Sequence, residues 1–262
     1  VIFIKMCSKI FFNNKWNDSL SKKIFMRKSL IDNNAFKYSE CNSKDIDHVV
    51  KSAKIGAKNN KKLSRYEISK YLKKISIKIN NNKYKIAKLQ SQETGKPLFQ
   101  SIKEIEYCVK LWFFASEVVK LKIDYKVFCE KNTYANIINE PVGIVALIIP
   151  WNYPMVVTSE RLPFILAAGN SIIIKPSEYA SQSIIFLLKI INEASLPVGT
   201  INLVTGSRKV GQKLVENDHV NMVSFTGSTK VGKEIMTICA KSIKRVSLEL
   251  GGKNSIIVLK DA

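Results

Sequence analysis

The chain has 262 residues, of which 46% are hydrophobic, and a formal net charge of +21 at pH 7. This length and apolar content allow a sizeable core in one large or two small domains, and they exclude a disordered tail and a fibrous protein. The charge suggests nucleic acid or an anionic membrane surface as a partner. The lysines are scattered and suit solvated helix faces, however, so a nucleic-acid binder is the least favoured interpretation.

Cysteines and apolar runs indicate the compartment. The five cysteines are Cys7, Cys41, Cys108, Cys129 and Cys239. They form no CxxC pair and the chain has only two histidines, so we expect reduced thiols in a cytoplasmic protein and no metal site. Pro150, Asn152 and Pro154 interrupt the longest apolar run before membrane-spanning length, and the basic N-terminus lacks a signal-peptide cleavage pattern. No membrane partner is therefore expected.

The first half of the chain predicts short strands followed by helices. Residues 10–16 and 24–32 are expected to form edge strands or an extended arm that packs on a neighbour. Apolar residues then recur at helical spacing and predict four helices in a helical layer. The first helix is expected to be capped by Ser43 or Asp45, and the second to start near Ser64. The third is expected to cover 84–93 and the fourth 99–120. Residues 125–138 predict a hairpin outside the main sheet.

The second half alternates strands and helices. Strands are predicted at 143–149, 171–174, 200–204, 222–225, 246–250 and 255–259. Helices are predicted at 155–168, at 181–194, from Gly206 to Asn217, and at 230–241. Uncharged β-branched strands joined through helices indicate parallel strands covered on both faces, hence a doubly wound α/β fold. Ligands of such sheets bind beyond the carboxyl ends of the strands.

One polar turn at such a strand end contains Lys175 and Glu178. A carboxylate there can accept hydrogen bonds from both ribose hydroxyls of an adenosine, and it would repel a 2′-phosphate. The alternative is a surface turn with a local ion pair between the two side chains. Taken alone, this turn favours the alternative.

A second turn, residues 225–232, ends a strand and opens a helix, so free N–H groups and the positive helix end face the crevice. Gly227 lets backbone approach a ligand, Ser228 or Thr229 caps the helix or binds a phosphate, and Gly232 lets the helix pack closely. This pattern fits a dinucleotide pyrophosphate site, although it is not the G-x-G-x-x-G fingerprint. An ordinary capped helix is the alternative.

Two further residues are candidates for catalysis. Asn152, between Trp151 and Tyr153 in a proline-flanked turn, has a side-chain amide suited to donating to an oxyanion. Glu249 ends an apolar strand before two glycines, and burial there would raise its pKa towards the range of a general base. Each could instead be a satisfied polar residue in a turn.

Six ordered motifs resemble those of the NAD(P)-dependent aldehyde dehydrogenase superfamily. They are PWNYP at 150–154, AAGN at 167–170, KPSE at 175–178, LPVG at 196–199, FTGST at 225–229 and LELGGK at 248–253. The stretches FFNNKWNDS and QETGKPL at 92–98 resemble it too, so the resemblance covers essentially the whole chain. It implies a Rossmann-like doubly wound parallel sheet with an N-terminal helical layer and a protruding oligomerisation hairpin.

The resemblance also implies a mechanism and a cofactor. A Cys thiolate attacks a small aldehyde, a hydride passes to nicotinamide, and water hydrolyses the thioester. Asn152 would hold the oxyanion and Glu249 would be the general base. The cofactor would be NAD, with NADP disfavoured by Glu178. The implied cofactor-binding residues are Ile148, Ile149, Pro150, Trp151, Lys175, Pro176, Ser177, Glu178, Gly206, Gly211, Phe225, Thr226, Gly227, Ser228, Val231, Gly232, Leu250 and Gly251.

Two departures from the family pattern stand out. The turn 204–211 is one residue shorter than usual and lacks a middle glycine, so contacts to the adenosine side are expected to differ. No cysteine occurs in 250–262, where the chain continues beyond the base, and Cys239 is expected in the core. Because nucleophilic catalysis needs that thiolate, we expect this chain alone to be inactive.

The expected organisation has four parts. They are an N-terminal arm and helical part (1–122), an oligomerisation-type hairpin (123–140), a dinucleotide-binding core (141–250) and the start of a truncated catalytic domain (251–262). The first interpretation is the cofactor-binding half of an aldehyde dehydrogenase. The second is a truncated module, a pseudoenzyme or the product of a decaying gene, that binds NAD or a subunit. The family forms homo-oligomers, and the state of this chain stays open.

Overall fold

A seven-stranded sheet with the strand order β11-β10-β7-β8-β9-β1-β2 forms the centre of the protein. A computed structural model describes residues 9–121, 124–131 and 133–262, so Cys7 and the first residue of the expected hairpin segment, Ile123, lie outside the described residues. At one edge, β1 (Lys9–Phe12) pairs antiparallel with β9 and with β2 (Lys15–Asp18). The parallel strands are β7 (Ile144–Ile148), β8 (Ser171–Lys175), β9 (Ile201–Leu203), β10 (Met222–Gly227) and β11 (Arg245–Leu250).

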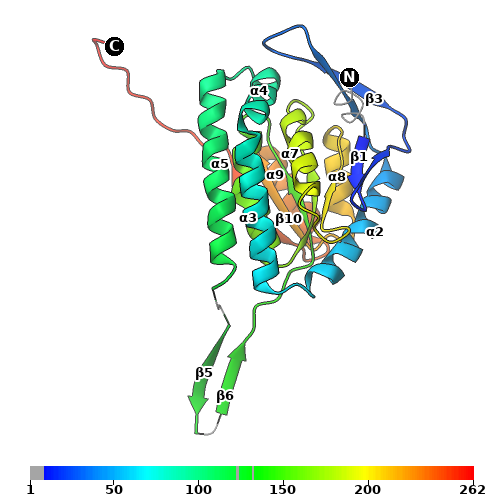
Figure 1. Ribbon diagram of the computed structural model, residues 1–262, viewed down its shortest axis with the longest axis vertical. Coiled ribbons are helices and arrows are strands. Elements are labelled where there is room, and N and C mark those ends of the chain that lie inside the picture. Colours follow the sequence, from blue (N-terminus) through cyan, green and yellow to red (C-terminus); the bar gives the residue numbers. More distant parts are fainter. Residues whose placement is uncertain (1–8, 122–123, 132) are drawn as a thin grey trace.

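Four helices connect the parallel strands and cover both faces of the sheet (Figure 1). They are α6 (Pro154–Ala167), α7 (Gln182–Asn192), α8 (Arg208–Glu216) and α9 (Thr229–Ala240). Side chains of α6 and α7 belong to one apolar cluster, and those of α8 and α9 belong to the other. Apart from Lys175 at the end of β8, the central strands β7, β8 and β9 are uncharged, as expected of strands whose two faces are both buried. The expected doubly wound α/β fold is confirmed.

The other helices divide unequally between the two faces. The expected helical layer is formed by α3 (Arg65–Asn81), α4 (Lys83–Thr94) and α5 (Leu98–Val118), which pack outside α6 and α7. By contrast α2 (Ser43–Asn60) packs on the opposite face, because Ile46, Val49 and Ala53 join the cluster of α8 and α9. None of the helices in the described ranges combines the length and apolar character needed to cross a bilayer.

The N-cap of α2 is Asn42, not Ser43 or Asp45 as expected. The Asn42 side chain accepts the N–H of Asp45 at 3.0 Å, and the Asp45 carboxylate accepts the N–H of Asn42 at 2.9 Å. Asp45 is therefore the third residue of a capping box rather than the cap itself. Ser64 caps α3 as expected, and Gly95, at φ 73°, ends α4 in the left-handed conformation.

Two hairpins lie outside the main sheet. The first pairs β3 (Ile24–Lys28) with β4 (Ala35–Ser39), so the expected arm pairs within the chain. The second pairs β5 (Tyr125–Glu130) with β6 (Thr133–Ile137) and confirms the hairpin expected there. Figure 1 shows this second hairpin projecting away from the body of the protein. Phe128 and Tyr134 pair on it with ring centroids 5.4 Å apart, and both are exposed.

The strand expected at 255–259 is wrong. These residues form no strand, and Ile256 to Leu259 are exposed. A strand needs backbone partners on a neighbouring chain segment, and none of the described residues lies in position to supply them. Figure 1 shows this segment running away from the sheet. The apolar pattern of residues 255–259 is therefore not enough to predict a strand.

Gly56 of α2 lies directly against the loop before β9. A Cβ atom at this position would lie 2.0 Å from the backbone oxygen of Gly199 and 2.6 Å from the nitrogen of Thr200. Gly199 has a φ of 80°, which side chains rarely tolerate. This pair of glycines lets α2 pack at backbone distance from the sheet.

We expect Gly56→Ala to lower the free energy of unfolding by about 3 kcal/mol, because neither backbone can move aside without losing its packing. Urea denaturation followed by circular dichroism measures this change. Gly252→Ala is the matched control: nothing lies within 4 Å of its added Cβ, so its change should stay within about 0.5 kcal/mol. Equal effects of the two substitutions would contradict the packing argument.

Glu93 of α4 holds the first turn of α7. Its carboxylate accepts the N–H groups of Gln182 at 2.6 Å and Ser183 at 3.2 Å, and the hydroxyl of Ser183 also donates to it. These bonds favour the charged form, but burial outweighs them and raises the pKa of Glu93 from 4.5 to about 7. The carboxyl thus links two helices far apart in sequence.

The raised pKa of Glu93 predicts a pH dependence. Below pH 4.5 the group is protonated in both the folded and unfolded states, whereas between pH 4.5 and about 7 only the unfolded state releases the proton. The stability of the wild type relative to Glu93→Gln should therefore fall across this window, by up to about 3 kcal/mol. Unfolding curves of both proteins at pH 4, 5, 6 and 7.5 check it. A difference that rises with pH would contradict it.

Candidate functional site

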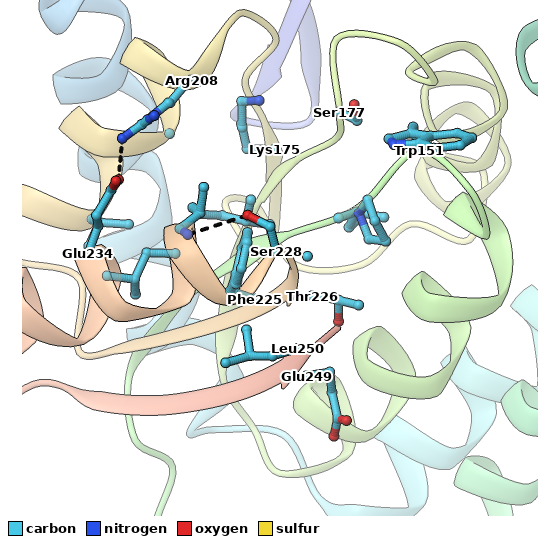
Figure 2. A pocket seen from close by; sticks show the side chains of 18 of the residues that line it. Trp151, Lys175, Ser177, Arg208, Phe225, Thr226, Ser228, Glu234, Glu249 and Leu250 are labelled. Atoms are coloured by element: carbon cyan, nitrogen blue, oxygen red, sulfur yellow. Dashed lines mark hydrogen bonds and ion pairs between the residues drawn. The ribbon is translucent and has the colours of Figure 1, made fainter. Parts of the chain in front are cut away.

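A cavity of about 990 Å³ opens at the carboxyl ends of the parallel strands (Figure 2). It lies where the strand order reverses, because β7 is followed in the chain by β8 on one side and paired with β10 on the other. The predicted residues that line it are Ile148, Ile149, Pro150, Trp151, Asn152, Lys175, Ser177, Glu178, Gly211, Phe225, Thr226, Gly227, Ser228, Val231, Glu249, Leu250 and Gly251. The structure thus gathers turns separated by a hundred residues into one site.

Three of the predicted residues, Pro176, Gly206 and Gly232, do not line the cavity. Pro176 is buried beside it. A Cβ on Gly232 would lie 2.5 Å from Cδ2 of Leu250, so this glycine lets α9 pack closely on β11, as the sequence suggested. Gly206 shapes the turn before α8.

The N-terminus of α9 points its free N–H groups at the cavity. Ser228 is the N-cap, and its hydroxyl oxygen accepts the N–H of Val231 at 3.4 Å, the bond drawn in Figure 2. No acidic residue occurs in the first turn, so the positive helix end is not neutralised locally. Gly227 also has a packing reason, because a Cβ there would lie 2.4 Å from the ring of Phe225.

Lys175 and Glu178 form an ion pair at the end of β8, with Nζ and Oε2 3.5 Å apart. The Lys175 side chain is 5% exposed, whereas that of Glu178 is 25% exposed. Burial lowers the pKa of Lys175, and the charges of Glu178 and Glu40 oppose that shift. The local ion pair considered for this turn therefore exists, and its carboxylate still faces the cavity.

Asn152 lies in a loop that Lys96 anchors. The Asn152 side-chain oxygen accepts the N–H of Tyr153 at 3.0 Å, and its amide nitrogen has no acceptor among the described residues. Lys96 Nζ donates to the backbone oxygen of Asn152 at 3.1 Å and lies 3.7 Å from the centre of the Tyr153 ring. The same ammonium pairs with Glu104 at 2.6 Å in a nearly buried position. The loop that carries the free amide NH₂ is thus held by Lys96, which lies between α4 and α5 and is itself paired with Glu104 of α5.

The expected burial of Glu249 is wrong. Its side chain is 59% exposed, and its carboxylate forms an ion pair with Arg161 of α6, with Nη2 and Oε1 2.8 Å apart. Glu249 lies on β11, an edge strand with a neighbour on one side only among the described strands. In Figure 2 its carboxylate points away from Ser228 and Lys175.

Sequence reasoning missed eight lining residues. They are Tyr179, Arg208, Gln212, Val215, Glu234, Ile235, Thr237 and Ile238. Most lie on α8 or α9 at helical spacing from predicted residues, so projecting each helix face from Gly211 and Val231 would have found them. The ion pair between Arg208 and Glu234, drawn in Figure 2, joins two helices and leaves no local signal.

None of the described cysteines lies at the cavity. Cys41, Cys108 and Cys239 are buried, which confirms Cys239 as a core residue. Burial raises the pKa of Cys41 and of Cys108 to about 12, so neither is a thiolate at neutral pH. Cys129 is exposed on the projecting hairpin.

The anchoring of the Asn152 loop can be tested by removing Lys96. Lys96→Met should lower the free energy of unfolding by about 3 kcal/mol, because Glu104 loses its buried partner. The double variant Lys96→Met/Glu104→Leu should recover most of this loss, since no buried charge remains unpaired. Lys103→Met, an exposed lysine of the same region, serves as the charge control in urea denaturation. A loss no larger than that of the control would contradict the anchor.

Comparison with known proteins gives a consistent result. The model of the "Aldehyde dehydrogenase family" matches residues 16–262. Aminoaldehyde dehydrogenase 1, peroxisomal, from Pisum sativum is 38% identical over 227 residues, which are 83% of this chain and 45% of the relative. The chain spans about half the length of the relatives it matches.

Solved structures are similar over the same extent. The NAD-dependent aldehyde dehydrogenase from Sinorhizobium meliloti is 32% identical with a TM-score of 0.90, covering 94% of this chain and 50% of that one. The NAD+ complex of the aldehyde dehydrogenase from Bacillus cereus is 30% identical with a TM-score of 0.94, covering 99% and 54%. The similarity therefore includes the whole architecture described above.

Proposed function

Because this chain belongs to the aldehyde dehydrogenase family, we propose that it is the NAD-binding part of an enzyme that oxidises a small aldehyde to a carboxylate with water. The observation that supports this most is the cavity where the strand order reverses. A carboxylate for a ribose, a helix N-terminus for a pyrophosphate and a side-chain amide donor all face it. The similar Bacillus cereus structure is an NAD+ complex.

The residues present fit a dinucleotide in an extended arrangement. Glu178 would accept the hydroxyls of the adenosine ribose, and Lys175 would hold that carboxylate in place. The N-terminus of α9, with Ser228 as its cap, would take the pyrophosphate. The nicotinamide would then lie towards Trp151, which is in the loop after β7 and is 56% exposed. When bound, NAD supplies the hydride acceptor.

The remaining chemistry assigns roles to two side chains. The free amide NH₂ of Asn152 would donate to the oxyanion that develops on the aldehyde oxygen. Glu249 would take a proton from the attacking water at its carboxylate. For this it must exchange its ion pair with Arg161, which now occupies one carboxylate oxygen.

We further propose that these 262 residues bind NAD without oxidising aldehydes. The reaction needs a thiolate, and the described cysteines are buried with raised pKa values or lie on the distant hairpin. The alternative function, a module that binds NAD or a subunit, is favoured by the exposed rings of Phe128 and Tyr134 on the β5–β6 hairpin. We also propose that the chain associates with a second copy through that hairpin. The division of the chain into four parts, 1–122, 123–140, 141–250 and 251–262, stays a proposal as well.

The substrate class and the location are two further parts of the proposal. The name of the Pisum sativum relative indicates an aminoaldehyde, which we propose as the substrate class. A cytoplasmic location stays a prediction based on free cysteines. The name of the same relative places that protein in the peroxisome.

Calorimetric titration of the purified chain with NAD tests the cofactor site. We expect binding, a rise in Tm at millimolar NAD, and about tenfold weaker binding by Glu178→Ala, which loses hydrogen bonds to a charged acceptor. Lys54→Met, on an exposed face of α2, is the control and should bind as the wild type does. A folded wild-type chain that shows no heat and no Tm shift would remove the site.

Turnover is tested separately with NAD and a panel of small aldehydes, including aminoaldehydes. We expect no NADH formation by the purified chain, because no described thiolate reaches the cavity. Steady NADH production that survives Glu249→Gln and Asn152→Ala would contradict the assigned roles. Any robust turnover by the wild type would contradict the missing nucleophile.

A further inference from the structure

Two side chains that line the α8 end of the cavity, and one N–H in the turn directly before α8, could bind a phosphate, and each is paired with a carboxylate. The ammonium of Lys175 pairs with Glu178 at 3.5 Å. The guanidinium of Arg208 pairs with Glu234. The N–H of Ser207, at the start of α8, donates to Glu40 at 2.9 Å. In a chain of net charge +21, the two cations that line this end of the cavity are thus both paired with carboxylates.

Glu40 is a fixed carboxylate rather than a mobile surface group. Its two oxygens accept the N–H of Ser207 at 2.9 Å and the hydroxyl of Ser207 at 2.6 Å. Its own backbone N–H donates to the oxygen of Lys23 at 2.9 Å, and its backbone oxygen accepts the hydroxyl of Ser21. Contacts at both the backbone and the side chain therefore hold Glu40 at the N-terminus of α8.

The turn before α8 is shaped around this carboxylate. Gly206 has a φ of 141°, and a Cβ there would lie 3.1 Å from Glu40 Oε2 and 2.5 Å from Val210. The hydroxyl of Thr205 donates to the backbone oxygen of Ser39 at 2.7 Å, so the end of β4 runs beside the turn. This is the turn that is expected, from the resemblance of the sequence to the family, to be one residue shorter than usual and to lack a middle glycine.

Glu40 also acts on Lys175. Its negative charge, like the larger effect of Glu178, favours the protonated form of the buried ammonium. Because the carboxylates of Glu178 and Glu40 both act on the ammonium of Lys175, these three groups together have no net positive charge with which to attract a further anion. The helix N-terminus, which otherwise binds phosphates well, already has an anion on its first N–H.

We propose that Glu40 is a specificity-determining residue for the cofactor, which makes this end of the cavity accept an unphosphorylated ribose and reject a 2′-phosphate. It acts together with Glu178, the residue already assigned to the ribose. Glu40 follows β4 and accepts the N–H of Ser207, whereas Glu178 follows β8 and pairs with Lys175. The inference rests on the proposed function, because it needs the adenosine ribose to lie beside Lys175.

Calorimetric titration with NAD and NADP tests the proposal on the purified chain. Glu40→Gln should raise the affinity for NADP relative to NAD by about tenfold, because a like charge near the 2′-phosphate is removed. The affinity for NAD itself should change less than about threefold, since Glu178 still binds the hydroxyls. Titration with ADP and 2′,5′-ADP should show the same change, because these ligands lack the nicotinamide end.

Three further variants separate charge from packing and from net charge. Glu40→Ser also removes the charge and should give the same shift, which keeps the test decisive if Glu40→Gln does not fold. Glu40→Asp keeps the charge and should keep the preference for NAD. Glu216→Gln removes a carboxylate from the far end of α8 and should change neither affinity.

The outcomes are distinguishable from a failure of the proposed function. If the wild type binds neither NAD nor ADP, the cofactor site is absent and both proposals fail. If the wild type binds NAD and the charge-removing variants leave the ratio of NADP to NAD affinity unchanged, only the role of Glu40 is overturned. An equal shift in Glu40→Asp and Glu40→Gln would also overturn it, because packing of the turn would then be the cause.

Discussion

The reversal of strand order between β7 and β10 is the constraint on which the rest of this structure depends. Crossover helices that lie on opposite faces of a sheet leave an opening between them only at such a reversal. Here the ends of β7, β8, β10 and β11 and the starts of α8 and α9 meet at that opening. Polar side chains on those strand ends can therefore face a ligand without the cost of burial in the core.

Local pairing, not net charge, sets the electrostatic character of this opening. The chain has a formal charge of +21, yet the two cations that line the α8 end of the cavity, Lys175 and Arg208, each have a carboxylate partner. The positive end of α9 has no such partner, since its first turn has no acidic residue. This division agrees with the proposal that one side of the cavity binds a pyrophosphate and the other accepts neutral hydroxyls. Such a division requires residues from several elements, because a single short motif cannot place opposite charges on both sides.

The N-terminal third of the chain supports the site from outside it. Lys96 reaches from the end of α4 to the Asn152 loop, Glu93 holds the start of α7, and Glu40 holds the start of α8. All three side chains bond backbone groups in loops or helix starts, where main-chain donors and acceptors lack partners of their own. The helical layer and the β3–β4 hairpin are therefore more than packing material, since they fix the turns that face the ligand.

The sequence by itself determined the strands, the helices and the motif turns. Buried β-branched runs, helical spacing and the ordered polar turns are all local, so Lys175, Asn152 and Ser228 were predictable as site residues. It could not determine the partners of those residues. Glu249 looked buried from its leucine neighbours but is exposed on an edge strand, and 255–259 had a strand pattern but no partner strand. The pairings of Glu40 with Ser207 and of Lys96 with Asn152 join residues far apart in sequence. Only the tertiary structure decided them, because hydrogen bonds and ion pairs depend on distances that topology creates and local pattern does not encode.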